Sequence, residues 1–260
     1  MIDQPFLLTS NPLFYETSSL QLASSPVENL TNDNMDMDWR SLGLSDVYVV
    51  LRNVGAVDTV AVLHSNLRPD DTLRVRAANT VAGLLSAPVW DSGAVPAVLG
   101  TLTVPYTAKT LVDVPAGTQA TYWRFDFSSS GHPDGQVKAS RIVMGQRFVI
   151  GSGIDYEWSK GVIDDSIVST APNYEDVQEF PSRPVVQATL GQMNESDFNK
   201  LDTFMMSVGV KRPVLFAPEP DNLGSVQSWT VYGRMKVAYK GVNLYHNLWE
   251  SDLEVVGLKA

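Results

Sequence analysis

The alternation of hydrophobic and polar residues is clearest between Tyr122 and Ser128, where every second residue carries a large ring. These rings belong to Trp123, Phe125 and Phe127. Residues two apart lie on the same face of a β-strand, so the rings form a ridge with polar residues behind it. Gly, Pro and Asp in residues 129–135 favour a turn, and a second strand is expected near 139–148. We therefore predict two strands joined by a hairpin loop, with the aromatic ridge covered by a facing sheet.

Short strand-like runs also fill much of the chain before this hairpin. They are Val47–Leu51, Val57–His64, Thr72–Arg76 and, as a strand or an edge, Tyr106–Pro115. These runs alternate or are rich in β-branched residues, turn residues separate them, and no helical period runs through them. Strands that recur at a spacing of roughly ten residues predict an all-β sandwich.

The pattern changes after residue 181. Pro184–Leu190 is a strand candidate, and the next segment has apolar residues three and four positions apart, as on one face of a helix. This stripe consists of Phe198, Leu201, Phe204, Met205 and Val208. Asn194 can cap the start of the helix, and Gly209 can end it. Further strand candidates follow, so we predict a small α+β unit with one main helix on a sheet.

These patterns divide the chain into four parts. Residues 1–22 carry apolar pairs and suit either an extended arm that docks on a neighbouring subunit or the first strand of the sandwich. Residues 23–161 make up the predicted sandwich. Residues 162–181 are acidic, contain two prolines and lack periodicity, which predicts a linker or a long exposed loop. Residues 182–260 make up the α+β domain.

Composition narrows the possible functions. The 260 residues are 44% hydrophobic, which is enough for a substantial core. A net charge of −10 and an isoelectric point near 4.7 argue against nonspecific binding to nucleic acid or anionic membranes, because both need a basic surface. The absence of cysteine excludes disulfides, thiolate metal sites and cysteine nucleophiles. We expect no secretory signal, because no basic segment precedes the short apolar run at the N-terminus, and no membrane insertion.

Candidate catalytic chemistry is sparse. The three histidines are His64, His132 and His246, and none lies two to four residues from another, so the sequence predicts no histidine-rich zinc site. The motifs GxSxG, Walker A and HExxH do not occur. Residues 32–38 alternate Asn and Asp as a calcium loop begins, but the required later Gly and Glu are missing. We expect Asx-turns there, with a structural calcium ion as the alternative, and we predict no catalytic residue, no metal ligand and no cofactor.

Several segments together resemble a known family. Trp39-Arg40-Ser41 follows an Asn-rich loop, a strand candidate runs into the turn at residues 64–67 (HSNL), and the strand after the aromatic ridge ends at residues 142–145 (IVMG). With these features, residues 24–160 resemble the discoidin-like, galactose-binding-type jelly rolls found in bacteriophage tail proteins. Residues 180–260 have a strand, a helix and then strands, and they are similar to the C-terminal part of minor tail and distal tail proteins of long-tailed phages.

This resemblance implies a non-enzymatic structural component of a phage tail tip or baseplate. It implies a mainly β fold, with a jelly-roll sandwich followed by the smaller α+β domain. It also implies a homo-oligomeric ring, hexameric as in known distal tail proteins, with tail tube, hub and tape measure proteins as partners. The expected location is the virion, after assembly in the host cytoplasm.

Two other functions are compatible with the sequence. The first is a carbohydrate-binding module that attaches to a glycan on the host surface, because tryptophan rings can stack on sugars. Of the six tryptophans, Trp90 is the binding candidate, since its segment PVWDSG reads as a loop, whereas Trp39, Trp123 and Trp229 are expected in the core. The second is a hydrolase with a sandwich appendage, although the C-terminal hundred residues are too few for most glycosidase folds.

Overall fold

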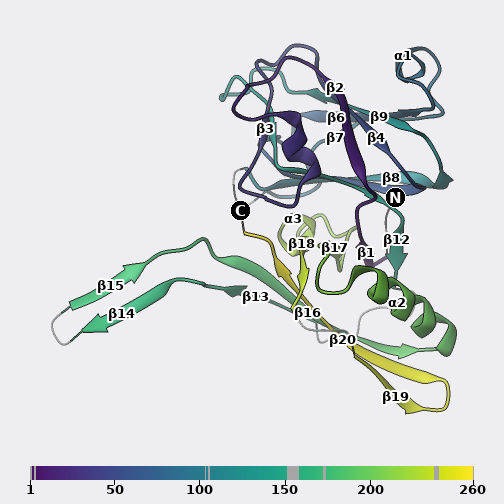
Figure 1. Cartoon of the computed structure of the whole chain (residues 1–260), viewed down its shortest axis with the longest axis vertical. Helices are drawn as coiled ribbons and strands as arrows, with labels where there is room; N and C mark the ends of the chain where they lie inside the picture. Colours follow the sequence, from purple (N-terminus) through teal and green to yellow (C-terminus); the bar gives the residue numbers. More distant parts are fainter. Residues whose placement is uncertain are drawn as a thin grey trace.

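The computed structural model describes residues 2, 4–102, 104, 106–150, 158–171, 174–236 and 240–259. Most of the elements are β-strands, and they form a sandwich of two sheets stacked on a third, larger sheet (Figure 1). The predicted fold class, mainly β with a sandwich followed by a region that holds one main helix, is confirmed.

The outer sheet of the sandwich has five strands. Its order is β2 (Leu13–Ser18), β4 (Val47–Asn53), β9 (Tyr122–Ser128), β6 (Thr72–Ala78) and β7 (Trp90–Pro96). The inner sheet has three strands, in the order β11 (Arg141–Gly145), β5 (Val57–Ser65) and β8 (Ala108–Thr118). Between these sheets lie the aromatic ridge of β9 and Trp39, whose ring packs 5.5 Å from that of Phe127. The predicted burial of the ridge by a facing sheet is therefore confirmed.

Short elements close the ends of the sandwich. They are η1 (Val27–Thr31), β3 (Trp39–Arg40), α1 (Gly83–Ser86) and β10 (Lys138–Ala139). β3 and β10 pair with one another, so residues nearly one hundred positions apart close the same end.

The predicted hairpin from residue 122 to 148 is wrong in its pairing. β9 pairs with β4 and β6 in the outer sheet, whereas β11 pairs with β5 in the inner sheet. The turn between them carries the chain from one sheet to the other. The physical reason is burial, because β9 alternates buried and partly exposed residues, whereas every residue of β11 is buried. A strand that is apolar on both faces needs a sheet that is covered on both sides, and the inner sheet is such a sheet.

The large sheet lies below the sandwich. Its order is β12 (Arg147–Val149), β1 (Phe6–Leu8), β17 (Val214–Ala217), β18 (Val231–Met235), β20 (Leu248–Gly257), β16 (Arg183–Met193) and β13 (Ser159–Ile163), with β19 (Gly241–Tyr245) paired to β20. The helix α2 (Glu195–Val208) packs on the face away from the sandwich, and α3 (Val226–Trp229) precedes β18 (Figure 1).

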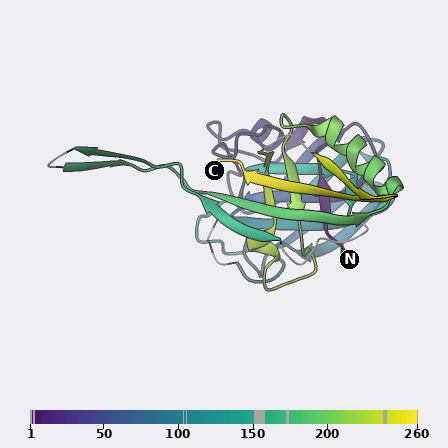
Figure 2. The ribbon, with the colours of Figure 1, turned by 90° about the horizontal axis from the view of Figure 1, so that it is seen from below.

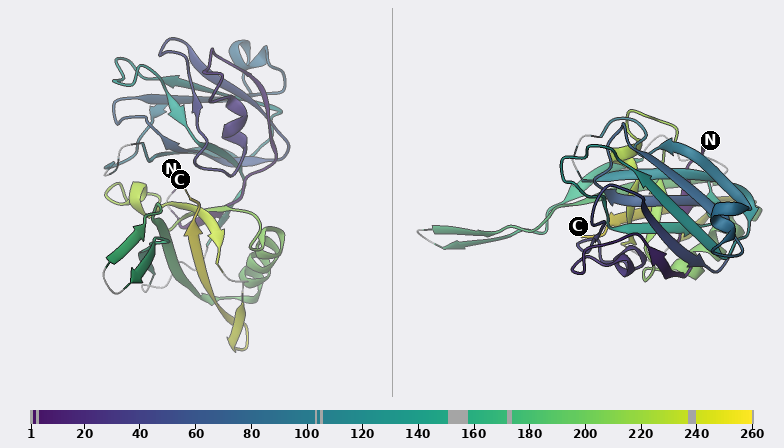
Figure 3. Two further views of the ribbon diagram at one scale, coloured as in Figure 1. Left: turned by 60° about the vertical axis from the view of Figure 1, so that its left-hand side comes forward. Right: turned by 90° about the horizontal axis from the view of Figure 1, so that it is seen from above.

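Strand β1 shows how the layers are held together. Phe6 and Leu8 pack towards the inner sheet, against residues such as Leu63, while Leu7 packs on the opposite side with the residues of α2. All three are fully buried. The large sheet is therefore apolar on both faces, and the views in Figure 3 show it stacked directly against the sandwich. Apolar side chains that cover both faces of a sheet hold the two parts of the chain in one body.

The main helix forms as predicted. The side chain of Asn194 accepts a hydrogen bond of 2.9 Å from the backbone N–H of Asp197, and Gly209 ends the helix with a φ of 55°. Leu201, Met205 and Val208 are buried against the large sheet. The cap and the apolar stripe are local features, which is why the sequence alone was enough to locate this helix.

The boundaries of the parts differ from those expected. Residues 1–22 supply both β1 of the large sheet and β2 of the sandwich, so neither an arm nor a sandwich strand alone describes them. β12 and β13 fall within 23–161 but pair in the large sheet. The prediction of a linker or loop at 162–181 is wrong, because β14 (Ile167–Ala171) and β15 (Tyr174–Gln178) form an antiparallel hairpin. We call this hairpin the arm.

Within the described ranges, every helix is too short or too polar to span a lipid bilayer.

Candidate functional site

A cavity of about 680 Å³ lies where the loops at one end of the sandwich meet the large sheet. The sandwich contributes the end of β5, the start of β8 and the loop before β8, and the large sheet contributes parts of β13, β16 and the segment around α3. Its walls carry hydroxyl, amide and amino groups beside apolar patches. The cavity therefore depends on the stacking of the two parts and exists in neither of them alone.

Lys109 reaches the cavity from β8, and Gln227 of α3 holds its backbone. The side chain of Gln227 accepts a hydrogen bond of 2.9 Å from the backbone N–H of Lys109 and donates one of 2.8 Å to its carbonyl oxygen. The Lys109 Nζ donates to the carbonyl oxygen of Gln227. Burial first, and the positive charge of Lys160 second, together lower the pKa of Lys109 to about 8. Gln227 therefore fixes a lysine whose charge the surroundings disfavour.

His64, Lys138 and Lys160 are the other basic side chains that line the same cavity. His64 lies near the end of β5 with a positive φ of 51°, and burial, followed by the charge of Lys109, lowers its pKa to about 4. Lys160 comes from β13 and is more exposed than His64, and burial lowers its pKa. Among the residues that the structure describes, neither Lys109 nor Lys160 has a carboxylate partner. Lys109 and Lys160 therefore bring positive charge to the cavity, and neither is paired with a carboxylate among the described residues.

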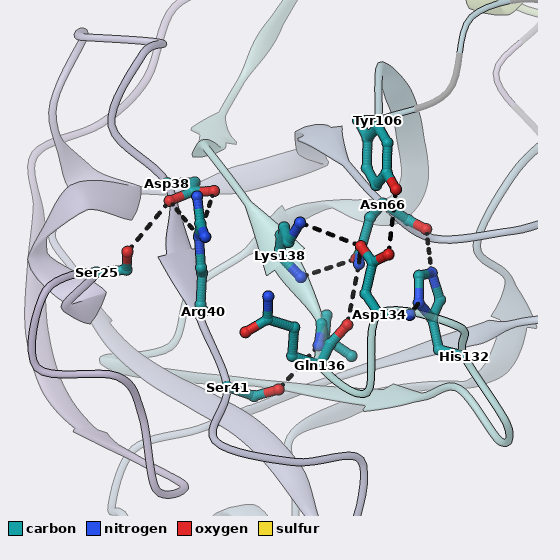
Figure 4. A network of polar contacts seen from close by, with 11 residues as sticks. Ser25, Asp38, Arg40, Ser41, Asn66, Tyr106, His132, Asp134, Gln136 and Lys138 are labelled. Atoms are coloured by element: carbon teal, nitrogen blue, oxygen red, sulfur yellow. Dashed lines mark hydrogen bonds and ion pairs between the residues drawn. The ribbon is translucent and has the colours of Figure 1, made fainter.

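A polar network borders the cavity on the sandwich side (Figure 4). Asn66 donates hydrogen bonds to Asp134 (3.1 Å) and to the carbonyl oxygen of Gln136 (2.9 Å). Asp134 also accepts a hydrogen bond from the hydroxyl of Tyr106 and pairs with Lys138, both at 3.1 Å. The hydrogen bond from Asn66 lowers the pKa of Asp134, and Lys138 and Tyr106 lower it further. The charge of Lys138 is therefore balanced within the network, in contrast to those of Lys109 and Lys160.

His132 belongs to the same network and has a structural role (Figure 4). Its Nδ1 accepts a hydrogen bond of 3.1 Å from the backbone N–H of Asp134, so the Nε2 carries the proton and donates to the carbonyl oxygen of Asn66 at 2.8 Å. His132 is therefore bonded within the sandwich by both of its ring nitrogens.

The acidic loop at residues 29–38 is held by its own turns. The side chain of Asn32 accepts a hydrogen bond of 2.9 Å from the backbone N–H of Asn34, and Asn34 does the same for Asp36 at 3.2 Å. The expected Asx-turns are confirmed. Asp38 pairs with Arg40 at 2.8 Å. No group of three His, Asp or Glu side chains that can hold a metal ion occurs within the described ranges.

Trp90, the glycan candidate from the sequence, lies away from the cavity. It opens β7 rather than a loop, it is partly buried, and its ring lies 6.0 Å from that of the core residue Trp123. The loop interpretation of its segment is therefore wrong, because Trp90 pairs with Ala77 of β6. A role for Trp90 in sugar binding stays a prediction.

The arm is the most exposed part of the described chain. It projects far from the body of the protein, as Figures 1 and 2 show. Its strands form a two-stranded sheet of their own, with Val168 opposite Val177 on one face and Ile167 and Tyr174 on the other. Ile167, Val168, Tyr174 and Val177 are 48–66% exposed. Residues 162–181 contain five acidic residues and no lysine or arginine, so the arm is both apolar and negative.

A second hollow, of about 800 Å³, lies at the base of the arm and carries positive charge. We call it the basic groove, and it is lined by Arg183, Arg234, Lys236 and Lys259, with Asp33 as the acidic residue. Asp165 at the base of the arm pairs with Arg183 (2.8 Å) and Lys259 (3.5 Å), and Lys236 pairs with Glu254 (2.9 Å). Arg234 is exposed and has no acidic partner among the described residues. The groove therefore retains positive charge for an outside partner.

Lys109, Lys160 and Gln227 were not predicted from the sequence. The only local signal is a lysine at the start of the apolar strand run AKTLVDV, and a lysine at a strand end is common enough to pass unnoticed. Gln227 lies 118 residues from Lys109, so their contact is a product of the tertiary fold.

Neither a protein-family model nor a curated protein matches the chain. Solved structures that resemble it include a module, CBM32-3, from a family 31 glycoside hydrolase of Clostridium perfringens, with 13% identity and a TM-score of 0.43, covering 54% of this chain and 96% of the module. The family 32 carbohydrate-binding module of C. perfringens NanJ, solved with galactose, has 11% identity and a TM-score of 0.40, covering 52% and 97%. The family 32 module of Streptococcus pneumoniae EndoD has 13% identity and a TM-score of 0.39, covering 53% and 98%. The likeness spans about half of this chain, and functional conclusions rest on its own residues.

Proposed function

We propose that this protein is a non-enzymatic assembly subunit whose arm docks on the basic groove of the next copy. The observation that carries the proposal is the arm itself, a projecting two-stranded hairpin with exposed apolar side chains on both faces. An isolated two-stranded hairpin is marginally stable in water, and its unpaired edges are open to another chain. A partner that covers the arm stabilises the hairpin and pairs its open edges.

The charges of the chain favour a second copy as that partner. The arm is acidic, and the basic groove on the same molecule contains Arg234, which has no acidic partner among the described residues. Each copy therefore offers one acidic projection and one basic recess. Because these surfaces differ, the contact is heterologous, and repeated contacts of this kind close into a ring or continue as a filament.

Removal of residues 167–178, with a short Gly-Asn turn in their place, is expected to convert the oligomer to a monomer. The arm belongs to a sheet of its own, so its loss leaves the four other sheets unchanged. Size-exclusion chromatography with light scattering measures the mass, and circular dichroism checks that the fold is retained. A wild-type protein that is monomeric at micromolar concentration, or an armless variant that still assembles, contradicts the proposal.

A charge exchange tests the pairing of arm and groove. Arg234→Glu and Glu175→Arg are each expected to weaken assembly about tenfold, and the double variant is expected to restore it, because the attraction returns with reversed signs. Lys200→Glu on the exposed face of α2 is the matched control and is expected to leave assembly unchanged.

More specifically, we propose that the assembly is a bacteriophage tail tip. Its support is the resemblance of residues 180–260 to minor and distal tail proteins and of residues 24–160 to the sandwiches of tail proteins. In that setting the neighbours are further copies in a ring together with tube, hub and tape measure proteins, and the location is the virion.

Glycan binding is the second candidate function, and the observation that favours it is the cavity. Its walls combine hydroxyl and amide groups with Tyr106 and Leu102, which is the mixture of polar and apolar contacts that a sugar uses. A sandwich that presents such a cavity at its loop end is suited to attach the assembly to a cell surface. Assembly and glycan binding involve separate surfaces, so one protein can perform both.

Glycan binding predicts a measurable affinity for a monosaccharide or a short oligosaccharide, in the millimolar to micromolar range, by isothermal titration calorimetry. If the cavity is the site, Trp90→Ala keeps the affinity. If Trp90 is the site, as the sequence suggested, Trp90→Ala abolishes it. The absence of heat with a panel of neutral and acidic saccharides contradicts this candidate function and leaves the arm proposal untouched.

A further inference from the structure

Three basic side chains converge on the cavity from separate parts of the chain. His64 lies near the end of β5, Lys109 lies near the start of β8 and Lys160 lies on β13, so the sandwich supplies two and the large sheet supplies one. Lys109 and Lys160 have no carboxylate partner among the described residues. The cavity also contains Lys138, whose charge Asp134 already balances.

Such a cluster is costly without a counter-ion. Partly buried amino groups lose hydration, and like charges near one another repel, and both effects disfavour the charged form. The structure nevertheless fixes Lys109 in place through three hydrogen bonds with Gln227. The acidic groups that line the cavity are Asp36 and Asp38. Asp38 is already paired with Arg40, and Asp36 forms no ion pair with Lys109 or Lys160 within the described ranges. An anion that enters the cavity removes the repulsion and uses the lysine donors.

We propose that the cavity binds the carboxylate of an acidic saccharide, held by Lys109 and Lys160, with the sugar ring against the neutral part of the lining. This inference rests on glycan binding as the second candidate function, and it specifies the class of glycan. Lysine ammonium groups form charge-assisted hydrogen bonds with carboxylates.

The remaining lining fits the neutral part of such a ligand. Ser140, Ser228 and Thr230 offer hydroxyl groups. Tyr106, 51% exposed, and Leu102 supply a flat and apolar surface. A volume of about 680 Å³ is within the range of small-molecule sites and accommodates one or two sugar rings. A small inorganic anion leaves most of this lining without a contact, so a saccharide acid uses the cavity more fully.

Isothermal titration calorimetry of the full-length protein with three probes tests the proposal. The probes are glucuronic acid, galactose and sodium sulfate. Glucuronic acid is expected to bind at least about tenfold more tightly than galactose, because only the acid engages the lysines. It is also expected to bind more tightly than sulfate, which lacks the sugar ring.

Variants locate the binding. Lys160→Gln changes an exposed side chain at the cavity and preserves the fold. It is expected to weaken the binding of glucuronic acid about tenfold and to leave the affinity for galactose unchanged. Lys109→Gln has the same expected effect, and its thermal unfolding is measured in parallel because this side chain is half-buried. Lys200→Gln on α2 is the matched control and keeps wild-type affinity. The armless variant also keeps it, because the arm does not line the cavity.

The outcomes separate this inference from the proposed functions. Equal affinity for galactose and glucuronic acid, or an unchanged affinity in Lys160→Gln, overturns the acidic preference while glycan binding stands. Binding of sulfate with the same affinity as glucuronic acid overturns the saccharide part. No binding of any saccharide overturns both the inference and the glycan candidate, and the oligomeric state still decides the arm proposal on its own.

Discussion

Gly233→Ala is expected to destabilise the protein by about 4 kcal/mol or more, a large fraction of the roughly 5–15 kcal/mol by which a typical domain is stable. Gly233 lies in β18, between Val214 of β17 and Gly257 of β20. A Cβ atom at this position overlaps the carbonyl oxygen of Val256 and lies 2.5 Å from its carbonyl carbon and 2.8 Å from the nitrogen of Gly257. All three atoms belong to the backbone of a central strand, so no side-chain rotation relieves the clash.

Urea unfolding followed by circular dichroism measures this effect, with Gly43→Ala as the control. A Cβ at Gly43 meets nothing within 4 Å, so its expected change is within about 0.5 kcal/mol of zero. Equal unfolding midpoints for the two variants would show that β18 and β20 do not approach one another as closely as described. The large sheet, which carries Lys160 and the base of the arm, would then need a different strand order.

Acidification from pH 7 to pH 4 is expected to cost the wild-type protein about 2 kcal/mol through His64 alone. Its folded pKa is about 4, below the ordinary value of 6.5, because burial and the charge of Lys109 disfavour the imidazolium. Above pH 6.5 the side chain is neutral in both states and contributes nothing. Between these values the unfolded chain binds the proton and the folded chain does not, so stability falls as the pH falls.

His64→Asn separates this contribution from that of the carboxylates. Asparagine tolerates the positive φ of 51° at this position better than most residues and does not titrate. Urea unfolding at pH 7, 5.5 and 4 is expected to show a smaller loss of stability in the variant than in the wild type, and the difference isolates His64 because the acidic residues are common to both. Parallel pH profiles for the two proteins would mean that His64 is solvated in the folded state.

The strands of the sandwich were predictable, whereas their pairing was not. The alternation at residues 122–128 fixes which side of β9 is buried, because the period of two is a property of the strand itself. The partner of β9 is not encoded in that period. The hairpin prediction was wrong because β11 is apolar on both faces and belongs in the inner sheet. That sheet is buried on its second face only because the large sheet packs against it.

The arm illustrates a different kind of failure. Residues 162–181 are acidic, contain prolines and bury little, and these are the properties of a loop. They nevertheless pair as strands, continuing the ladder between β13 and β16 away from the body of the protein. An exposed hairpin lacks the buried face on which recognition of strands from sequence depends.

The sequence by itself determined the mainly β class, the burial of the aromatic ridge, and the helix with its Asn194 cap and Gly209 end, because each follows from residues only a few positions apart. The tertiary structure decided how the three large sheets stack and that His64, Lys109 and Lys160 line one cavity. It also decided the hydrogen bonds between Gln227 and Lys109. The contact between Lys109 and Gln227 joins residues 118 positions apart in the chain. Local periodicity carries no information about such distant pairs, and only the burial of apolar faces against one another brings them together.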